Sequence, residues 1–596
     1  MNCGSTRQSR TRRQSAGLLQ RHPAALDDHH RQRPSPRYHG SREVIIGIIR
    51  PTLPPYDPLD WQRRPFPERA RMVCASWATQ GYGTPVAVFA LYAVKIAAYI
   101  IGWALFCSAS LGSLADIGSW WLTPLALQKA VLWSMLFEVT GLGCGSGPLT
   151  ARYVPPVGGA LYFLRPGTVR LPLLGAGTRR RVVDVLLYAS LLVALVVGLL
   201  APALATRHLL AVAGILGVLG LRDKTILLAA RAEHYLVVVL VFLLADDVTQ
   251  WLAGSMAVWG ALWFFAGFSK LNHHFSAVVC VMMSNSPVVR SVWLRKKMYR
   301  DFPDDLRPST LAHVLGHFGT ALELSVPVIL LLTTGPGPLL VVGMVLMLAL
   351  HSYITANVPM GVPLEWNVLV VYGAVVLFWG HPEVTVLDMG LPIAALVLTT
   401  SVALPLLGNR LPAHISFLPS MRYYAGNWAM SVWLFEGESH RKLHENLTMT
   451  SPWVTDQIDA VYDDATITAL LGKVMAFRLM HLHGRTLGAL LPTALGGRAL
   501  SAYTWVDGEI VAGLVLGWNF GDGHLHDERM LGIIQDACGF APGELRCIFV
   551  ESQPLLSGTL HCRVHDAADG LLHETHLSVS ALRARQPWTL GEDAGA

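Results

Sequence analysis

Ionisable side chains lie inside several apolar stretches of this 596-residue sequence, and they are the first candidates for chemistry. Lys270 ends the apolar run 251–271 and is followed by Asn272, His273 and His274. A lysine at the end of a membrane helix usually extends its ammonium group to the lipid headgroups. If the amine is desolvated instead, its neutral form is favoured and it can act as a general base. Position alone leaves both hypotheses open.

A second group of charges, Arg231, Glu233 and His234, falls in the first half of the apolar run 225–245. Charges at membrane depth almost always face the bundle interior or a water-filled cavity, where they pair with one another. These residues therefore predict either a structural Arg–Glu pair that holds helices together or part of a functional site.

Polar residues also recur at helical spacing in the apolar run 311–334. His313, His317, Thr320 and Glu323 fall within an arc of about 120°, so we expect one polar stripe that faces inward. Histidines four residues apart can bind a metal, but Val314 follows His313 and the HExxH form is therefore missing. We favour an interhelical hydrogen-bond network over a metal site.

The composition indicates that the helices which carry these charges are embedded in a membrane. Hydrophobic residues make up 52% of the sequence and charged residues 14%, whereas about a quarter of a soluble protein is charged. Runs of roughly 17 to 25 apolar residues are long enough to cross a bilayer core of about 30 Å. We expect about ten spans, at 85–108, 121–142, 183–205, 208–221, 225–245, 251–269, 311–334, 338–357, 366–380 and 389–408.

The chain divides into four regions. Residues 1–44 lack apolar periodicity and are expected to be disordered, and 45–84 form a proline-broken, basic juxtamembrane segment. Residues 85–410 form the transmembrane bundle, and 411–596 form a C-terminal domain. Arginine-rich loops such as 143–181 are expected on the cytoplasmic side, which places both termini in the cytoplasm.

The overall fold class is therefore mainly α: a polytopic helical membrane bundle with a small C-terminal α+β soluble domain. Within that domain we predict an amphipathic helix over 470–495, a helix over 526–538 and strands over 510–518, 545–551 and 559–564. The run 276–285 is too short to cross a bilayer and is interpreted as re-entrant.

Several classes of site lack support in the sequence. The eight cysteines are scattered without a CxxC pair, so no disulfide framework is predicted. The phosphate-loop signature GxxxxGK[ST] is absent, and membrane topology explains the basic loops without nucleic acid. No metal site is predicted and the cofactor is unknown. Hydrogen-bonded or solvated roles are favoured for six C-terminal histidines: His524, His526, His561, His565, His573 and His576.

The segment 266–271, Ala-Gly-Phe-Ser-Lys-Leu, resembles the AGxxKL-type signature of the HTTM superfamily, which includes the vitamin K-dependent γ-carboxylases. Residues 233–236, 315–324 and 351–353 resemble further pieces of that superfamily in the same order. This resemblance implies an HTTM-like bundle in which Lys270 is the base and His234 assists it. The carboxylases carry a large extracytoplasmic domain that is missing here, so a lipid or quinone substrate is expected rather than a peptide.

A resemblance that extends over more of the chain begins at about residue 49. With the segments 147–168 and 517–528, the chain resembles an actinobacterial family of multi-pass proteins without an assigned function. It implies a bacterial plasma membrane as the location and membrane lipids as the surroundings.

Three functions remain open. The first is a membrane-embedded enzyme that uses Lys270 as a base on a lipid or quinone-like substrate. The second is a transporter of lipids or small molecules whose intramembrane charges line a path. The third is a scaffold without catalysis. The tentative contacts for a substrate are Arg231, Glu233, His273, His317, Glu323 and His351.

Overall fold

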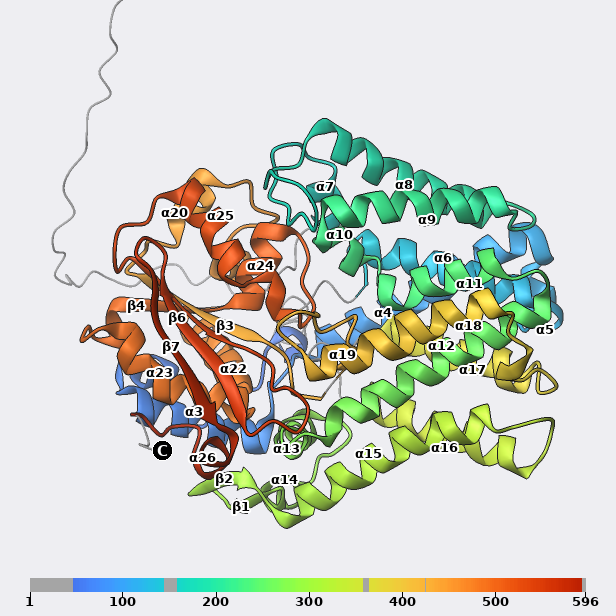
Figure 1. Cartoon of the computed structure of the whole chain (residues 1–596). Coiled ribbons are helices and arrows are strands. Elements are labelled where there is room, and N and C mark those ends of the chain that lie inside the picture. Colours follow the sequence, from blue (N-terminus) through green and yellow to red (C-terminus); the bar gives the residue numbers. More distant parts are fainter. Residues whose placement is uncertain (1–46, 144–157, 357–363, 424, 592–596) are drawn as a thin grey trace, which may run out of the picture. The chain divides into compact units, whose positions relative to one another are not determined.

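Six helices in the described part of the chain are long and apolar enough to cross a membrane (Figure 1). The computed structural model describes residues 47–143, 158–356, 364–423 and 425–591, so the expected disorder of residues 1–44 lies outside it. The six candidate spans are α4 (Val86–Leu111), α8 (Val182–Leu200), α12 with η3 (Val248–Leu271), α15 (Thr310–Leu331), α16 (Pro338–Thr355) and α18 to α19 (Leu391–Arg410). The predicted count of about ten is not confirmed.

Four of the expected spans form shorter or interrupted helices. The run 225–245 is broken because Arg231 adopts a left-handed conformation, with φ of 52°, directly after α10. L-residues other than glycine rarely adopt this conformation, and a helix cannot continue through it. The shorter elements are α6 (Pro124–Val139), α9 (Thr206–Arg222), α10 (Lys224–Ala229), the π-turn η2 (Ala232–Leu236), α11 (Val237–Leu244), α17 (Leu364–Ala374) and the π-turn η4 (Val375–Trp379).

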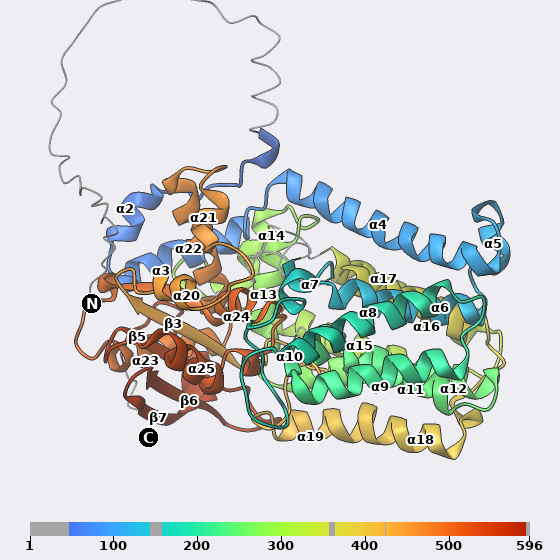
Figure 2. The ribbon, with the colours of Figure 1, turned by 90° about the horizontal axis from the view of Figure 1, so that it is seen from above.

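Helix α12 lies at the centre of the helical region (Figures 1 and 2). Its residues are buried on all sides, whereas α4 is mostly exposed. It packs against α11, α15, α17 and α18. Gly260 permits one close approach, because a Cβ there would lie 2.5 Å from a methyl carbon of Leu331 on α15. A helix that is apolar on every face is stable only when neighbours surround it.

Short elements join the helical region to the C-terminal part. Helix α13 (Phe275–Asn285) follows α12 and packs against α15 and α3. The segment expected to be juxtamembrane forms two helices, and α3 packs against α22. The connecting elements are α2 (Pro58–Arg63), α3 (Phe66–Gln80), α5 (Ile117–Trp120), α7 (Gly158–Phe163), α14 (Val292–Lys297), β1 (Tyr299–Asp301) and β2 (Asp305–Pro308).

The C-terminal part contains a five-stranded antiparallel sheet in the order β4-β3-β5-β6-β7. Its strands are β3 (Met430–Glu436), β4 (Tyr503–Asp507), β5 (Leu545–Val550), β6 (Thr559–Asp566) and β7 (Gly570–Ser578). The predicted strands at 545–551 and 559–564 and the predicted helix at 526–538 are confirmed by β5, β6 and α25 (Glu528–Cys538). The other helices here are α20 (Arg441–Asn446), α21 (Val454–Ile458) and α26 (Val579–Ala584).

Two sequence predictions for this region are wrong. The run 510–518 forms helix α24 (Gly508–Leu516), because a short run buried on all sides carries no periodicity that separates strand from helix. The run 470–495 is not one amphipathic helix. It comprises α22 (Asp464–Met480) and α23 (Thr486–Leu495), which are bent by 101° at the intervening break and are buried on nearly every face.

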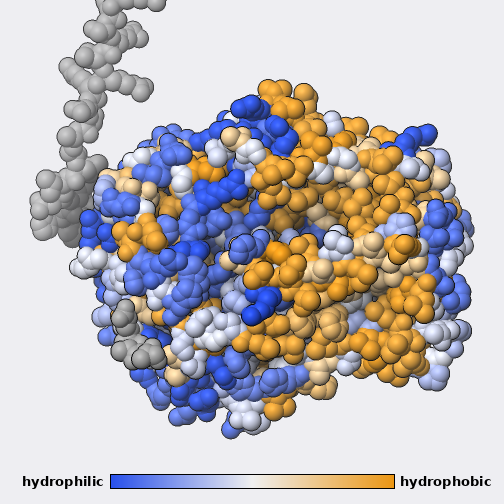
Figure 3. Space-filling model, in the orientation of Figure 1, coloured by the Kyte–Doolittle hydropathy of each residue, from blue (hydrophilic) through white to orange (hydrophobic). Residues whose placement is uncertain are grey.

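The surface of the protein divides into a hydrophobic part and a hydrophilic part. Hydrophobic residues gather over the helical region in the view of Figure 3, and hydrophilic residues gather over the sheet region. Exposed leucines and valines on α4, α8 and α16 contribute to the apolar surface. A lipid bilayer is the surrounding that removes such a surface from water.

Candidate functional site

The amine of Lys270 lies inside the protein and is paired. Lys270 is in the 3₁₀ turn η3 (Ser269–Leu271), and 6% of its side chain is exposed. Its Nζ forms a short ion pair with the carboxylate of Glu323 on α15, and it lies 5.2 Å from the centre of the Phe275 ring. The Lys270 amine therefore ties η3 to α15.

His234 belongs to a different cluster. The indole N–H of Trp366 donates to its Nδ1 over 3.3 Å, and the ring of Trp259 lies 4.6 Å away between ring centres. Trp259 and Lys270 are on the same continuous helix, and at about 1.5 Å of rise per residue they are separated by roughly 16 Å. The contacts of the described residues therefore do not bring the predicted base and its predicted helper together.

Arg231 and Glu233 form a buried ion pair of 2.7 Å. The hydroxyl of Tyr423 donates to Glu233 over 2.9 Å, and the Arg231 guanidinium lies 5.1 Å from the ring of Trp366 and 5.7 Å from that of Phe520. These contacts join the break before η2 to α17 and to segments that follow the last candidate span. The Arg231–Glu233 pair therefore holds distant parts of the chain together.

His351 has hydrogen bonds at both ring nitrogens. The indole N–H of Trp263 on α12 donates to Nε2 over 2.8 Å, so the ring proton is on Nδ1, which donates to Oδ1 of Asn367 over 2.9 Å. His351 therefore joins three helices, α12, α16 and α17. These two hydrogen bonds fix the orientation of the His351 ring within the bundle.

The expected inward stripe on α15 is only partly present. Thr320 and Glu323 are buried, but His317 is exposed. Residues that are spread over an arc of about 120° cannot all face the interior of the bundle when their helix has neighbours on one side only. His313 lies at the other end of the stripe and lines a cavity.

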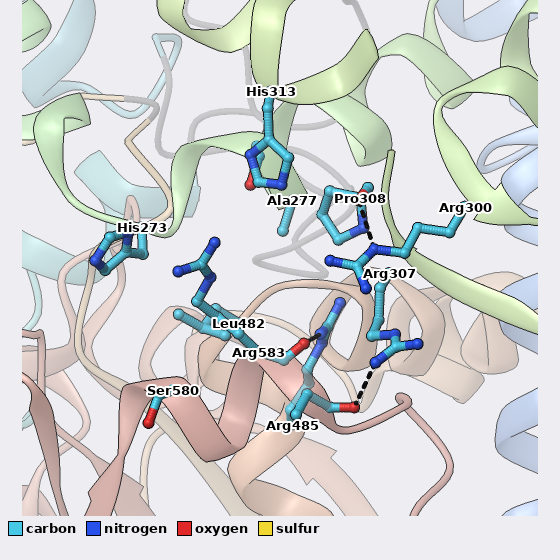
Figure 4. Close-up of a pocket in the computed structure, with 12 residues that line it drawn as sticks. His273, Ala277, Arg300, Arg307, Pro308, His313, Leu482, Arg485, Ser580 and Arg583 are labelled. Atoms are coloured by element: carbon cyan, nitrogen blue, oxygen red, sulfur yellow. Dashed lines mark hydrogen bonds between the residues drawn. The ribbon is translucent and has the colours of Figure 1, made fainter. Parts of the chain in front are cut away.

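That cavity is the arginine pocket, a hollow of about 250 Å³ where the sheet region meets the ends of α13 and α15 (Figure 4). It is lined by His273, Ser276, Ala277, Arg300, Arg307, Pro308, His313, Leu482, Arg485, Ser580, Arg583 and Ala584. Asp305 is beside it, but that carboxylate already forms an ion pair with Arg307. Four guanidinium groups thus share one hollow with two histidines.

The four arginines reach the pocket from three local structures. Arg300 and Arg307 are on the hairpin β1–β2, Arg583 is on α26, and Arg485 is just after the bend that follows α22. Nη1 of Arg485 donates to the carbonyls of Leu582, Arg583 and Arg585, so Arg485 anchors the turn that presents Arg583. Nε of Arg485 is buried and has no hydrogen-bond partner among the described residues.

His273 is in the same electrostatic environment. Partial burial and the neighbouring Arg583 cation lower the pKa of His273 below its ordinary value of 6.5, so the imidazole is neutral at pH 7. Of the residues that line the pocket, His273, His313 and Arg300, which ends the basic loop 295–300, stood out in the sequence. Arg307, Arg485 and Arg583 did not, because their grouping arises from segments far apart in the chain.

The C-terminal histidines are dispersed among separate partners. His561 pairs with Glu574 and stacks on His576, whereas His565 lies 3.7 Å from Glu528. Within the described ranges, no three or more histidine, cysteine or acidic side chains lie close enough together to hold a metal ion.

Comparison with known proteins identifies one family. A family model described as "Transmembrane protein of unknown function (DUF3556)" matches residues 46–595. No curated protein and no solved structure matches the chain.

Proposed function

Given that the chain belongs to this family of transmembrane proteins of unknown function, we propose that it binds the anionic head group of an amphipathic lipid. The observation that carries the proposal is the arginine pocket, whose lining residues include four arginines and no acid, while the carboxylate of Asp305 beside it is already paired with Arg307. Arginine binds phosphate and carboxylate groups through two parallel N–H bonds, which makes it suited to anion recognition.

The position of the pocket supports a lipid as the source of the anion. His313 is in the first turn of α15, a candidate membrane span, and it lines the pocket. Leu311, Val314 and Phe318, on the first turns of the same helix, are 37%, 58% and 68% exposed. At about 100° per residue they lie on another face of α15 from His313, so the acyl chains of a lipid bound in the pocket would reach this apolar surface around the start of the helix. Basic pockets between membrane helices on the cytoplasmic side are known sites for anionic head groups.

The same geometry favours an anionic lipid over the other ligands that the sequence leaves open. A quinone head group carries no charge that would need four arginines, so an anionic lipid is the better ligand. Lysine-base catalysis requires a substrate within reach of the Lys270 amine, and that amine is buried against Glu323 and the Phe275 ring. In this proposal the protein is a lipid-binding or lipid-carrying protein of a bacterial plasma membrane, with the pocket and both termini on the cytoplasmic side.

The test uses the purified full-length protein in nanodiscs that contain either zwitterionic phospholipid alone or an added fraction of anionic phospholipid. Native mass spectrometry counts the lipids retained, and inorganic phosphate is titrated in a parallel arm. We expect retention of the anionic lipid and a loss of roughly tenfold in affinity for each of Arg300→Gln and Arg583→Gln, which corresponds to about 1.4 kcal/mol.

Arg290→Gln is the matched control. Arg290 is exposed near the same basic loop and donates to one carbonyl, as Arg300 does, but it is outside the pocket. Competition by phosphate with no preference for anionic lipid would identify a free anion as the ligand and would overturn the lipid assignment. Equal binding by wild type, Arg300→Gln and Arg583→Gln would overturn the site.

A further inference from the structure

Ser416, His524 and Glu551 form a continuous hydrogen-bonded chain away from the arginine pocket. The Oγ of Ser416 lies 3.3 Å from Nδ1 of His524, and Nε2 of His524 lies 3.0 Å from a carboxylate oxygen of Glu551. A hydroxyl, an imidazole and a carboxylate in this order are the parts of a nucleophilic site for acyl transfer. We propose that these residues form a catalytic site that cleaves carboxylic esters of membrane lipids.

The carboxylate sets the protonation state of the imidazole. In the neutral form of His524, which is the form that can act as a base, Glu551 accepts from the Nε2 proton and Nδ1 accepts from the Ser416 hydroxyl. Burial acts to lower the pKa of His524, but the Glu551 carboxylate outweighs it and raises this pKa. Burial raises the pKa of Glu551, but the His524 charge and hydrogen bonds from His524 and Ser552 lower it to about 2.

The backbone of His524 is held on both sides. Its N–H donates to the side chain of Asp522, the residue that caps the 3₁₀ turn η9 (Gly523–Leu525), and its carbonyl accepts from Nζ of Lys224. Gly523 is required for the close approach to the chain before β3, because a Cβ there would lie 2.1 Å from the carbonyl oxygen of Ala429. The base is therefore fixed relative to the sheet.

Arg422 supplies a positive charge beside the nucleophile. Its guanidinium donates through Nη2 to the carbonyl of Ile415, the residue before Ser416, over 3.2 Å. Arg422 is 1% exposed, and its Nε and Nη1 have no hydrogen-bond partner among the described residues. N–H groups preorganised next to a nucleophile stabilise the oxyanion that develops on an attacked carbonyl.

The location indicates the substrate class. Ser416 follows closely after Arg410, where the last candidate span ends. Lys224, which holds the backbone of His524, begins the helix after the apolar helix α9. A site at the ends of membrane helices is placed to receive an ester near the lipid head group.

The proposed reaction balances without redox chemistry. The Oγ of Ser416 attacks the ester carbonyl carbon, and its proton passes to Nδ1 of His524 while the carbonyl oxygen becomes an oxyanion beside Arg422. The C–O bond to the alcohol then breaks, and the leaving oxygen takes the proton from His524. Water attacks the acyl-serine in the same way, which releases a carboxylic acid and restores Ser416.

A second serine–histidine pair in the chain provides an internal control. Ser431 lies 2.7 Å from Nδ1 of His526, but Nε2 of His526 has no partner among the described residues and no carboxylate orients the ring. Ser431 also accepts from the indole N–H of Trp433 in the sheet core. It is a buried structural hydroxyl, so it should not react as a nucleophile.

The test exposes the full-length protein in nanodiscs to an alkyl fluorophosphonate, which forms an Oγ–P bond as fluoride leaves. Peptide mass spectrometry is expected to find the adduct on Ser416, with no adduct on Ser431. Ser416→Ala should abolish labelling, whereas Glu551→Gln should slow it at least tenfold at a temperature well below the unfolding transition of both proteins. An unmodified Ser416 in the folded wild type would overturn the proposal, as would hydrolysis of a lipid ester by Ser416→Ala at the wild-type rate. Neither result depends on the arginine pocket.

Discussion

The ammonium of Lys270 and the carboxylate of Glu323 form a buried ion pair between the end of α12 and the middle of α15. Only 6% and 5% of the two side chains are exposed. Neither charge is therefore solvated by bulk water, and each depends on the other. Removal of either side chain leaves the other one buried without its partner.

Lys270→Met and Glu323→Leu should each destabilise the protein strongly, by about 3–5 kcal/mol, because each leaves one buried charge without its partner. The double variant Lys270→Met with Glu323→Leu removes both charges and should recover most of the lost stability. Thermal unfolding in detergent measures the four proteins. Additive effects in the double variant would show that the two side chains are not coupled.

The bend between α22 and α23 should not tolerate a side chain at Gly484. A Cβ there would lie 1.8 Å from the carbonyl oxygen of Arg478, and a backbone atom cannot move aside as a flexible side chain can. We expect Gly484→Ala to cost about 1–3 kcal/mol of stability. Gly532→Ala is the control, since Gly532 is on helix α25 with open space around it. That change should stabilise by up to about 1 kcal/mol.

The hydroxyl of Tyr423 should contribute more to stability than that of another bonded tyrosine. Tyr423 donates to the charged Glu233, whereas Tyr372 donates to the neutral carbonyl of Trp121. Hydrogen bonds to charged groups contribute about 1.5–3 kcal/mol and neutral ones about 1 kcal/mol. Tyr423→Phe should therefore lower the unfolding temperature more than Tyr372→Phe does. Equal shifts would mean that the Arg231–Glu233 pair does not depend on this donor.

The His524–Glu551 pair should make stability depend on pH in two directions. The raised pKa of His524 contributes stability that is fully present below about 6.5 and is lost as pH rises through the folded-state value. The lowered pKa of Glu551 contributes stability that is present above about 4.5 and is lost as pH falls toward 2. Asp522 and Lys224 also act on His524, and Arg422 acts on Glu551.

Glu551→Gln removes both contributions. The difference in unfolding temperature between wild type and this variant should be largest between about pH 4.5 and 6.5 and should shrink on either side. Unfolding curves of the two proteins from pH 3 to pH 9 measure it. A difference that is constant across this range would show that the pair does not ionise as the geometry requires.

Several elements of the C-terminal part show which strands and helices can be predicted from local sequence. β6 was predictable because alternate residues of Thr559–Asp566 are buried and half-buried, which produces period-two alternation. β3 was not predicted, since nearly all of its residues are buried and its run lacks alternation. The helix Gly508–Leu516 was taken for a strand for the same reason. Hydrophobic periodicity indicates secondary structure only where one face of a helix or strand is exposed to solvent or lies in a different environment from the other face.

The sequence by itself determined that this is a membrane protein of mainly helical fold, because hydrophobic content and run length are local properties. It also marked Lys270, Glu323, His234 and His351 as residues that need partners. Only the tertiary structure decided which partners they have, and it placed Lys270 with Glu323 and His351 with Trp263. The arginine pocket and the Ser416–His524–Glu551 chain were likewise decided by folding. Their members come from distant segments, and no spacing in a linear chain encodes a contact made across helices and strands.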